Sequence, residues 1–395
     1  MKNHLSTAYD QELSQNLVIS EYFYPSSGAT AQLVKDLADS LHEEGIPLLV
    51  ITSTSSTTDN QPYPVIRSSS KLRESPSVVS KILKGSYFFV FALSQLFSLR
   101  HQIKSILIFS NPPFIGLLGL ISKHIFGVKF FFVFQDLFPR SACLSGIFPY
   151  KGPIVSAWRY LLRQVVNTAD ATILLSDDMK HQFVREFGSR ANVRVIHNWS
   201  LHEPVLTYAP GSSSIQPLRV QYSGNFGRLH DMLTLLESSR QLPADLVSFS
   251  FVGGGSKRHQ IEAYKERFCL TNVEIHDYVP RSNLKTSILS CDLSVVSLIP
   301  GAENTVAPSK IYGLLSCAKP VLLISPLGSE LARIVTTNNL GFVIQPGDVA
   351  GLTDAILSCA MNRMQLEKMG YNALNYYNKH LGKQKSLKAY IETLS

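Results

Sequence analysis

Short apolar runs alternate with helix-like patterns along almost the whole chain, and this alternation restricts the possible fold more than any other feature. Apolar runs of about four to eight residues bounded by turn residues predict strands buried on both faces, which are typical of parallel sheets. The segments between the runs have helical spacing. Leu33, Leu37 and Leu41, for example, repeat every four residues before Gly45. The pattern therefore predicts an α/β fold.

The strand pattern occurs twice, on either side of a segment rich in Pro, Gly and Ser. In the first half we expect strands at 17–20, 48–52, 106–110, 130–134, 171–175 and 193–196. In the second half we expect them at 218–223, 247–252, 273–275, 293–298, 321–325 and 341–344. A chain of 395 residues is also long enough for two domains.

We therefore predict two doubly wound, Rossmann-like domains that face a cleft. The expected division is a first domain at 1–207, a linker at 208–217, a second domain at 218–377 and a C-terminal helix at 378–395 that returns to the first domain. Ligands of such sheets bind where loops leave the carboxyl ends of the strands.

Composition limits the partners of the chain. Hydrophobic residues make up 45% and charged residues 17%, which is enough for large cores and too apolar for a disordered chain. Lys and Arg outnumber Asp and Glu by 37 to 29, so a negatively charged partner is expected: a diphosphate, an acidic membrane surface or nucleic acid. No dense basic run is interleaved with aromatic residues, and nucleic acid is therefore not expected.

The cysteines predict neither a disulfide framework nor a zinc site, because the five of them are scattered and form no close pair. Residues 1–16 are polar and lack the apolar core of a signal peptide. No uninterrupted apolar run reaches the roughly 18 residues of a membrane-spanning helix. We expect a cytoplasmic protein.

Three loops in the second half each follow a predicted strand and have the composition of a phosphate site. They cover residues 222–230, 251–257 and 301–310, and the first two turn through glycine. In the third, Pro308 is suited to the first turn of a helix, which would place Ser309 and Lys310 beside free backbone amides. Arg228 and Lys310 can each donate a charge-assisted hydrogen bond to a phosphate, worth about 1.5–3 kcal/mol.

Each of these loops also has an ordinary interpretation. An isolated Gly-Gly-Gly is usually a plain turn, and a single Arg is usually solvated. The occurrence of all three loops in one domain, each after a strand, favours a site for a nucleotide diphosphate.

With these loops and with further motifs, the chain resembles the family 4 glycosyltransferases of the GT-B fold, in particular the bacterial branch that builds surface polysaccharide. The matching motifs extend over almost the whole length. They are Tyr22-Phe-Tyr-Pro25 with Gly28, Asn111-Pro-Pro113, Phe134-Gln-Asp-Leu-Phe-Pro139, Leu175-Ser-Asp-Asp-Met179, Val195-Ile-His-Asn-Trp199, Tyr278-Val-Pro280, Asp292 and Pro346-Gly-Asp348. The resemblance implies transfer of a sugar from a nucleotide sugar, hexosyltransferase in type, with retention and without a metal or other cofactor.

The resemblance also implies which domain binds which substrate. The first domain would bind the acceptor, a sugar or a lipid-linked sugar, and the second would bind a donor such as a UDP- or GDP-sugar. The expected catalytic residues are Asp136, Arg228 and Lys310. The expected donor-binding residues are Gly28, Gly224, Asn225, His230, Gly253, Gly254, Glu303, Asn304, Thr305 and Ser309.

The chain departs from the family pattern at the charged positions. An arginine and a lysine commonly follow the first strand of the second domain, and the aligned positions here hold Asn225 and His230. Two glutamates eight positions apart are replaced by Thr305 and Gly313, and the second of them usually binds the ribose. Glu303 lies two residues from the first of these positions.

Asp136 is the residue that we expect on the acceptor side, because it follows the very apolar strand at 130–134. Its carboxylate can orient an acceptor hydroxyl, while the departing phosphate oxygen takes the proton. The alternative is that Asp136 caps a turn before Pro139. His197 and His230 are weaker candidates, because a single histidine is more often structural.

Residues 86–99 form an apolar segment flanked by Lys81, Lys84, Arg100 and Lys104. It can lie in the surface of an anionic membrane, where the protein would be peripheral on the inner face. The alternative is a helix that covers the sheet of the first domain.

Three functions remain open on the sequence. The first is a retaining glycosyltransferase. The second is a GT-B epimerase that acts on the nucleotide sugar alone. The third is a silent member that only binds nucleotide or serves as a scaffold.

Overall fold

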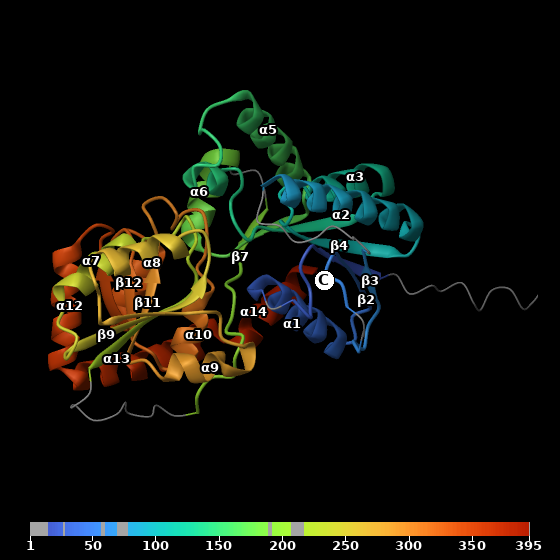
Figure 1. The fold of residues 1–395 in the computed structure, drawn as a ribbon. Helices are drawn as coiled ribbons and strands as arrows, with labels where there is room; N and C mark the ends of the chain where they lie inside the picture. Colours follow the sequence, from blue (N-terminus) through green and yellow to red (C-terminus); the bar gives the residue numbers. More distant parts are fainter. Residues whose placement is uncertain are drawn as a thin grey trace, which may run out of the picture.

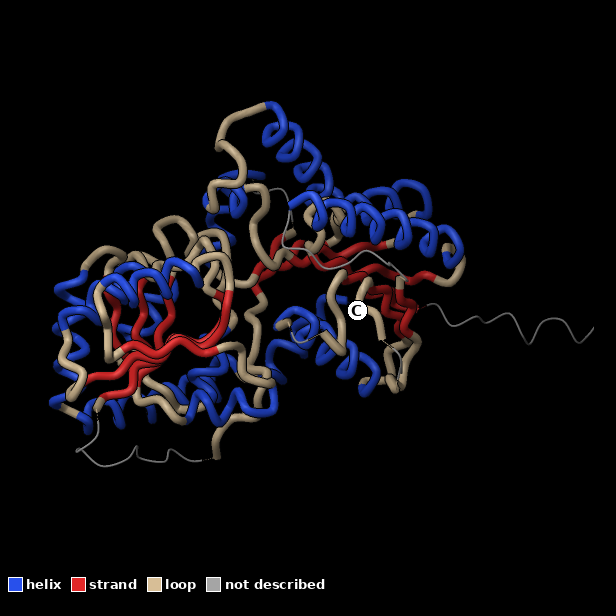
Figure 2. Tube along the Cα trace, viewed as in Figure 1, coloured by secondary structure: helices blue, strands red, loops and turns tan. Residues whose placement is uncertain are grey.

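The computed structural model describes residues 15–26, 28–56, 60–68, 78–188, 192–206 and 217–394. These residues form two domains, each built on one parallel sheet with helices on both faces (Figures 1 and 2). This arrangement confirms the predicted α/β fold. The linker expected at 208–217 lies outside the described residues except for its last position.

The first domain contains a seven-stranded sheet in the order β3-β2-β1-β4-β5-β6-β7, and all its pairs are parallel. The strands are β1 (Gln15–Ser20), β2 (Leu48–Thr52), β3 (Val65–Arg67), β4 (Ile103–Phe109), β5 (Lys129–Val133), β6 (Ala171–Leu174) and β7 (Val193–Val195). The chain leaves β1 toward β2 on one side, and β4 later pairs on the other. The winding direction therefore reverses between β1 and β4, where doubly wound sheets commonly bind ligands.

Helices cover both faces of this sheet. They are α1 (Ala29–Glu43), α2 (Val78–Leu99), α3 (Leu117–Phe126), α4 (Arg140–Leu144), α5 (Pro153–Thr168) and α6 (Asp177–Phe187). On one face, buried Phe88, Ala92 and Leu96 of α2 share a core with the strands. On the other face, α1 packs with the last helix of the chain (Figure 1).

The second domain contains a six-stranded parallel sheet in the order β10-β9-β8-β11-β12-β13. The strands are β8 (Leu218–Asn225), β9 (Val247–Gly254), β10 (Val273–His276), β11 (Leu293–Ser297), β12 (Val321–Ile324) and β13 (Gly341–Ile344). Its helices are α7 (Leu233–Gln241), α8 (Arg258–Arg267), α9 (Arg281–Leu289), α10 (Lys310–Ser316), α11 (Glu330–Thr337), α12 (Val349–Met361) and α13 (Arg363–Tyr376). Here the winding reverses between β8 and β11.

The end of the chain crosses back to the first domain. After α13 come a π-helical turn, η1 (Tyr377–Leu381), and α14 (Lys383–Leu394). Tyr390 and Leu394 of α14 are buried in the same core as Leu37 of α1. Asp36 of α1 accepts a hydrogen bond from Trp199 Nε1 at 2.9 Å and pairs with Lys383 Nζ at 3.2 Å. The core of the first domain is therefore completed by residues that follow the second.

The structure corrects two expectations. The helix expected to include Pro308 in its first turn begins at Lys310, because Val306 instead pairs with Asp136 in an antiparallel bridge. The apolar segment 86–99, expected to be too short to span a membrane, lies within the longer helical stretch Val79–Leu99, whose 21 residues have a mean hydropathy of 1.4 and are long and apolar enough by length and composition alone.

Candidate functional site

The parallel strands β8 and β9 stay paired up to their carboxyl ends. Gly224 is paired in register with Gly253, and Asn225 with Gly254. A Cβ atom added at Gly253 would lie 2.0 Å from the carbonyl oxygen of Gly224, and the φ of Gly253 is +139°, so only glycine fits there. The two predicted glycine turns are thus neighbours at the edge of the sheet where its strands have their carboxyl ends.

Lys310 brings a positive charge to this edge. Its Nζ lies 3.5 Å from the centroid of the Tyr222 ring, and a Cβ atom added at Gly224 would lie 3.4 Å from the same nitrogen. Lys310 Nζ is buried and, among the described residues, has no hydrogen-bond partner. Burial lowers the pKa of Lys310 to about 7. A buried nitrogen that lacks an acceptor among the described residues, beside the half-buried Gly224, is suited to an anion.

His230 lies next to Lys310 and is neutral. Its Nδ1 donates to the carbonyl oxygen of Ser297 at 2.7 Å. Burial, together with the nearby charge of Lys310, lowers the pKa of His230 to about 4. Lys257 Nζ donates to the carbonyl oxygen of His230 at 2.5 Å and holds the loop in place. His230 therefore supplies a polar group to the site and no charge.

Arg228 points across the gap between the domains. Its Nη1 donates to the carbonyl oxygen of Ser145 at 3.3 Å, just after α4 of the first domain. Arg228 and Asn225 are both exposed. The structure thus places Arg228 on the loop after β8, together with His230, and its guanidinium is hydrogen-bonded to the opposite domain.

The loop from Gly301 to Lys310 connects Lys310 with Asp136. The Leu137 amide donates to the Thr305 carbonyl oxygen at 2.9 Å, beside the bridge between Asp136 and Val306. Thr305 is fully buried, and its hydroxyl donates to the Gly301 carbonyl oxygen at 3.0 Å. Asp136 is half-buried as a residue, its carboxyl group has no hydrogen-bond partner among the described residues, and burial raises the pKa of that group. The loop therefore brings the two domains together beside Asp136.

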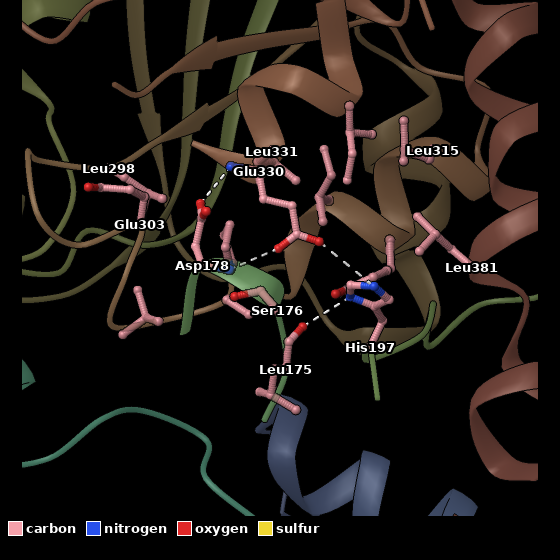
Figure 3. Close-up of a pocket in the computed structure, with 16 residues that line it drawn as sticks. Leu175, Ser176, Asp178, His197, Leu298, Glu303, Leu315, Glu330, Leu331 and Leu381 are labelled. Atoms are coloured by element: carbon pink, nitrogen blue, oxygen red, sulfur yellow. Dashed lines mark hydrogen bonds and ion pairs between the residues drawn. The ribbon is translucent and has the colours of Figure 1, made fainter. Parts of the chain in front are cut away.

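A pocket lies on the other side of this loop, between the domains (Figure 3). Its polar lining includes Asp178 and His197 from the first domain, and Glu303 and Glu330 from the second. Glu303 Oε1 accepts a hydrogen bond from Asn304 at 2.6 Å, whereas its Oε2 is buried and has no partner in the ranges that the structure describes. Burial raises the pKa of Glu303. This pocket contains neither Lys310 nor Arg228, so the predicted site residues fall into two adjoining regions.

Two helix N-termini in this pocket cap each other across the domain boundary. Glu330 Oε2 accepts the backbone amides of Asp177 and Asp178 at 2.6 and 3.4 Å. Asp178 Oδ2 in turn accepts the backbone amide of Glu330 at 2.6 Å. Ser176 and Ser329 precede these helices as N-cap residues, which sequence alone indicates. Nothing in the sequence indicates that the two helix starts, about 150 positions apart, face each other.

Two other predicted site residues, and the position where the family's second glutamate is missing, lie apart from these contacts. Gly28 is the N-cap residue of α1 and has no hydrogen bond to the other predicted site residues. Ser309 is the N-cap residue of α10 but makes no side-chain cap bond. A Cβ atom added at Gly313 would lie 3.9 Å from His202 and 4.0 Å from Ile288, so this position faces the segment that follows β7.

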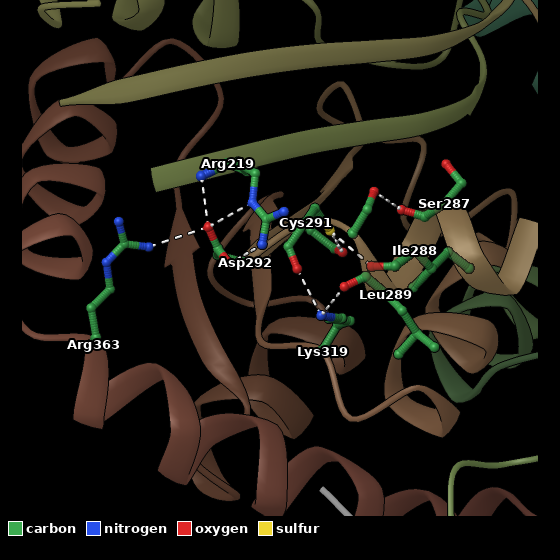
Figure 4. A network of polar contacts seen from close by, with 10 residues as sticks. Arg219, Ser287, Ile288, Leu289, Cys291, Asp292, Lys319 and Arg363 are labelled. Carbon is green, nitrogen blue, oxygen red and sulfur yellow. Dashed lines mark hydrogen bonds and ion pairs between the residues drawn. The ribbon is translucent and has the colours of Figure 1, made fainter. Parts of the chain in front are cut away.

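Asp292 lies at the opposite end of the second sheet, where its role is structural (Figure 4). It pairs with Arg219 at 2.9 Å and with Arg363 at 3.3 Å, and it accepts the Arg219 amide. Burial alone would raise the pKa of Asp292, but the bonds and charges of the two arginines hold it below its ordinary value. The same corner contains Lys319, which donates to the carbonyl oxygens of Leu289, at the end of α9, and of Cys291. This network joins the starts of β8 and β11 to α13.

No cluster of three or more His, Cys, Asp or Glu side chains suited to a metal occurs in the described part of the chain.

Two family models match the chain, one in each domain. The model described as "Glycosyltransferase Family 4" matches residues 30–199, and the model described as "Glycosyl transferases group 1" matches residues 218–362. Their boundary falls where the first sheet ends and the second begins.

Two curated relatives match about three fifths of the chain. "Probable glycosyltransferase WbjE" of Pseudomonas aeruginosa is 21% identical over 254 residues, which are 62% of this chain and 64% of that protein. WcaI of Escherichia coli, a colanic acid biosynthesis glycosyl transferase by its name, is 21% identical over 59% of this chain and 58% of its own. The chain thus spans about three fifths of the length of these curated relatives.

Solved structures share the fold over nearly the whole chain. Sucrose-phosphate synthase from Thermosynechococcus elongatus has a TM-score of 0.77 at 17% identity and covers 96% of this chain and 98% of its own. Anabaena HepE in complex with UDP has a TM-score of 0.71 at 17% identity, with 96% and 99% covered. At these identities the likeness establishes the two-domain fold.

Proposed function

Because the chain belongs to the family 4 glycosyltransferases and has their two-domain GT-B fold, we propose that it transfers a sugar from a nucleotide-diphosphate sugar to an acceptor hydroxyl. One observation carries the proposal. Within the described part of the chain, the buried Lys310 ammonium group has no acceptor; it lies at the glycine-lined end of β8, where a diphosphate would provide one. HepE, which shares the fold, has been solved with UDP and with UDP-glucose, and this supports a UDP-sugar donor here.

The donor would lie across the loops that follow β8, β9 and β11. Lys310 and the backbone near Gly224 and Gly253 would bind the diphosphate, with neutral His230 nearby. Arg228 would exchange its bond to the Ser145 carbonyl oxygen for a phosphate oxygen, because a charged acceptor forms the stronger hydrogen bond. Bound donor would then join the two domains through the same arginine.

We propose a retaining, metal-independent mechanism of hexosyl transfer. The bond between the sugar and the diphosphate breaks, the acceptor oxygen forms the new bond on the same face, and the departing phosphate oxygen takes the acceptor proton. Lys310 and Arg228 would stabilise the charge that develops on the diphosphate. Asp136 would orient the acceptor hydroxyl from the first domain.

We further propose that the protein acts in surface polysaccharide or glycolipid synthesis, as a peripheral protein on the inner face of the cytoplasmic membrane. Val79, Leu83, Tyr87, Val90 and Phe97 are exposed on α2 and recur at helical spacing, so they form one apolar stripe. The opposite face of α2 is buried in the domain. The stripe would enter the headgroup region, with Arg100 and Lys104, beyond the end of α2, near anionic lipids.

Flotation with vesicles that contain anionic lipid tests this attachment. Replacing the exposed residues Leu83, Val90 and Phe97 with Ser should leave the fold intact and reduce the floated fraction at least fivefold. Substitution of Phe88 is unsuitable, because that ring is fully buried. Replacing exposed Met361 and Met364, on the second domain, is the matched control. Equal flotation of the wild type, the Ser variant and the control would exclude membrane attachment through the apolar stripe of α2.

The activity itself is tested with nucleotide sugars. A thermal-shift screen of UDP- and GDP-sugars should identify a donor that raises the melting temperature, since a ligand that binds only the folded state stabilises it. The same donor should be hydrolysed slowly in the absence of acceptor. Binding without hydrolysis or transfer would favour the scaffold function, and a changed sugar on the intact nucleotide would favour an epimerase.

A further inference from the structure

Glu21 lies at the point of the first sheet where the winding direction reverses, and the function proposed above assigns it no role. It directly follows β1, beside the carboxyl end of β4, where the winding of the sheet reverses. Crevices at such points are the usual ligand sites of doubly wound sheets. Lys310 and His230 belong to the second domain. A group at the reversal point of the first sheet would therefore contact a different ligand, or a different part of the same ligand.

The backbone around Glu21 is held rigidly. The carbonyl oxygen of Glu21 accepts the hydroxyls of Thr52 at 3.1 Å and Ser53 at 2.8 Å. The Phe23 amide donates to Thr54 Oγ1 at 3.0 Å, and the Phe23 ring is fully buried. Arg67 Nη2 donates to the next carbonyl oxygen, that of Tyr24, at 3.0 Å. A loop fixed in this way presents its side chains in one arrangement, as a binding site requires.

Helix α2 brings two cations to this loop. A Cβ atom added at Gly85 would lie 2.9 Å from the Pro112 side chain, so glycine allows α2 to pack directly on the loop after β4. Lys84 and Lys81, one turn earlier, lie close enough to lower the pKa of Glu21 by their charge. Burial has the larger effect and raises the pKa of Glu21 to about 7. The carboxyl group can therefore both accept and donate hydrogen bonds near neutral pH.

Two tyrosines flank the carboxyl group. Tyr22 and Tyr24 are 44% and 43% exposed, although the Phe23 ring between them is buried. The Tyr22 hydroxyl forms a hydrogen bond with the Glu21 carboxyl group. Exposed aromatic rings beside a fixed carboxyl group suit a sugar, which offers apolar C–H faces to the rings and hydroxyls to the carboxyl.

We propose that Glu21, Tyr22 and Tyr24 form a subsite for the acceptor sugar, in which the Glu21 carboxyl group binds an acceptor hydroxyl. This inference rests on the proposed sugar transfer and deepens it by naming where the acceptor binds. Asp136, two strands away after β5, would act at the reacting hydroxyl, and Glu21 would hold a more distant one.

The test uses the full-length protein and the donor found in the thermal-shift screen. Octyl β-glucoside, octyl β-galactoside and octyl N-acetyl-β-glucosaminide serve as acceptor probes, and hydrolysis of the donor without acceptor is measured in parallel. Glu21→Gln should reduce transfer at least tenfold more than hydrolysis, mainly through a higher KM for the glycoside. The wild-type KM should fall as the pH rises from 6 to 8, because the ionised carboxylate is the stronger acceptor. That dependence should be absent in Glu21→Gln.

Two further variants control for structure. Glu44→Gln changes an exposed glutamate just beyond α1 and should behave like the wild type. Glu21→Asp keeps the charge and should recover part of the transfer that Glu21→Gln loses. Equal loss of transfer and hydrolysis, unchanged transfer in Glu21→Gln, or a wild type that hydrolyses donor but uses none of the glycosides would each overturn the subsite. A wild type that neither binds nor hydrolyses any nucleotide sugar would instead refute the proposed function.

Discussion

Replacing Lys310 with Met is expected to stabilise the unliganded protein and to weaken its binding of nucleoside diphosphates. A pKa that falls from 10.5 to about 7 costs the folded state at most about 4 kcal/mol at pH 7. Contact of the ammonium with the Tyr222 ring offsets about 1–2 kcal/mol of this. Lys310→Met should therefore raise the free energy of unfolding by about 2–3 kcal/mol at pH 7.

The gain has a defined pH dependence. Below the folded pKa of about 7, Lys310 is charged in both the folded and unfolded states, and the cost is fully present. As the pH rises toward 10.5, the unfolded chain also loses the proton and the cost disappears. Denaturant unfolding between pH 7 and pH 10 should thus show the two proteins converging. Lys368→Met, at an exposed lysine of α13, is the matched control and should show no such trend.

Ligand binding should show the opposite effect. Loss of one charge-assisted bond should weaken UDP or GDP about tenfold to a hundredfold. Because a phosphate restores the proton, wild-type binding should take up about half a proton at pH 7 and close to one at pH 8. Calorimetry in buffers of different ionisation enthalpy measures this uptake. A variant that is less stable than the wild type, binds UDP and GDP equally well and shows the same proton uptake would refute the reasoning.

Two further predictions concern the boundary between the domains. Asp136→Asn should reduce kcat for transfer at least a hundredfold and change donor affinity far less; an equal loss of both would make Asp136 a structural residue. Glu330→Ala removes the cap on the Asp177 and Asp178 amides, worth about 1–2 kcal/mol, and should speed hydrogen exchange at these two amides about tenfold. Unchanged exchange there would show that the reciprocal caps do not hold the domains together.

The sheets could be predicted because their strands are buried on both faces and read as apolar runs. Every strand predicted from such a run is present, within a few residues at its ends. The strand Val65–Arg67 was missed because it has three half-buried residues at the sheet edge, too few for a recognisable pattern. Local periodicity thus carries the fold of each domain.

Contacts between distant segments could not be predicted in this way. The helix begins at Lys310 and not at Pro308, after Val306 has paired with Asp136 across the domain boundary. The burial of Lys310 depends on Tyr222, which is nearly ninety positions earlier. The sequence indicated that a cation belongs at this site. Only the packing shows that the charge of Lys310 destabilises the unliganded protein.

The position of Lys310 also accounts for the neutral residue at His230. In the family pattern a lysine commonly occupies the aligned position, but a second ammonium there would face the buried one of Lys310, whose charge already lowers the pKa of His230. Two like charges in one buried site disfavour each other. His230→Lys alone should therefore weaken UDP binding, whereas His230→Lys combined with Lys310→Met should bind UDP more tightly than Lys310→Met alone. Calorimetry on the three variants gives the coupling energy, expected at about 1–3 kcal/mol. Additive effects would mean that the two positions bind separate groups.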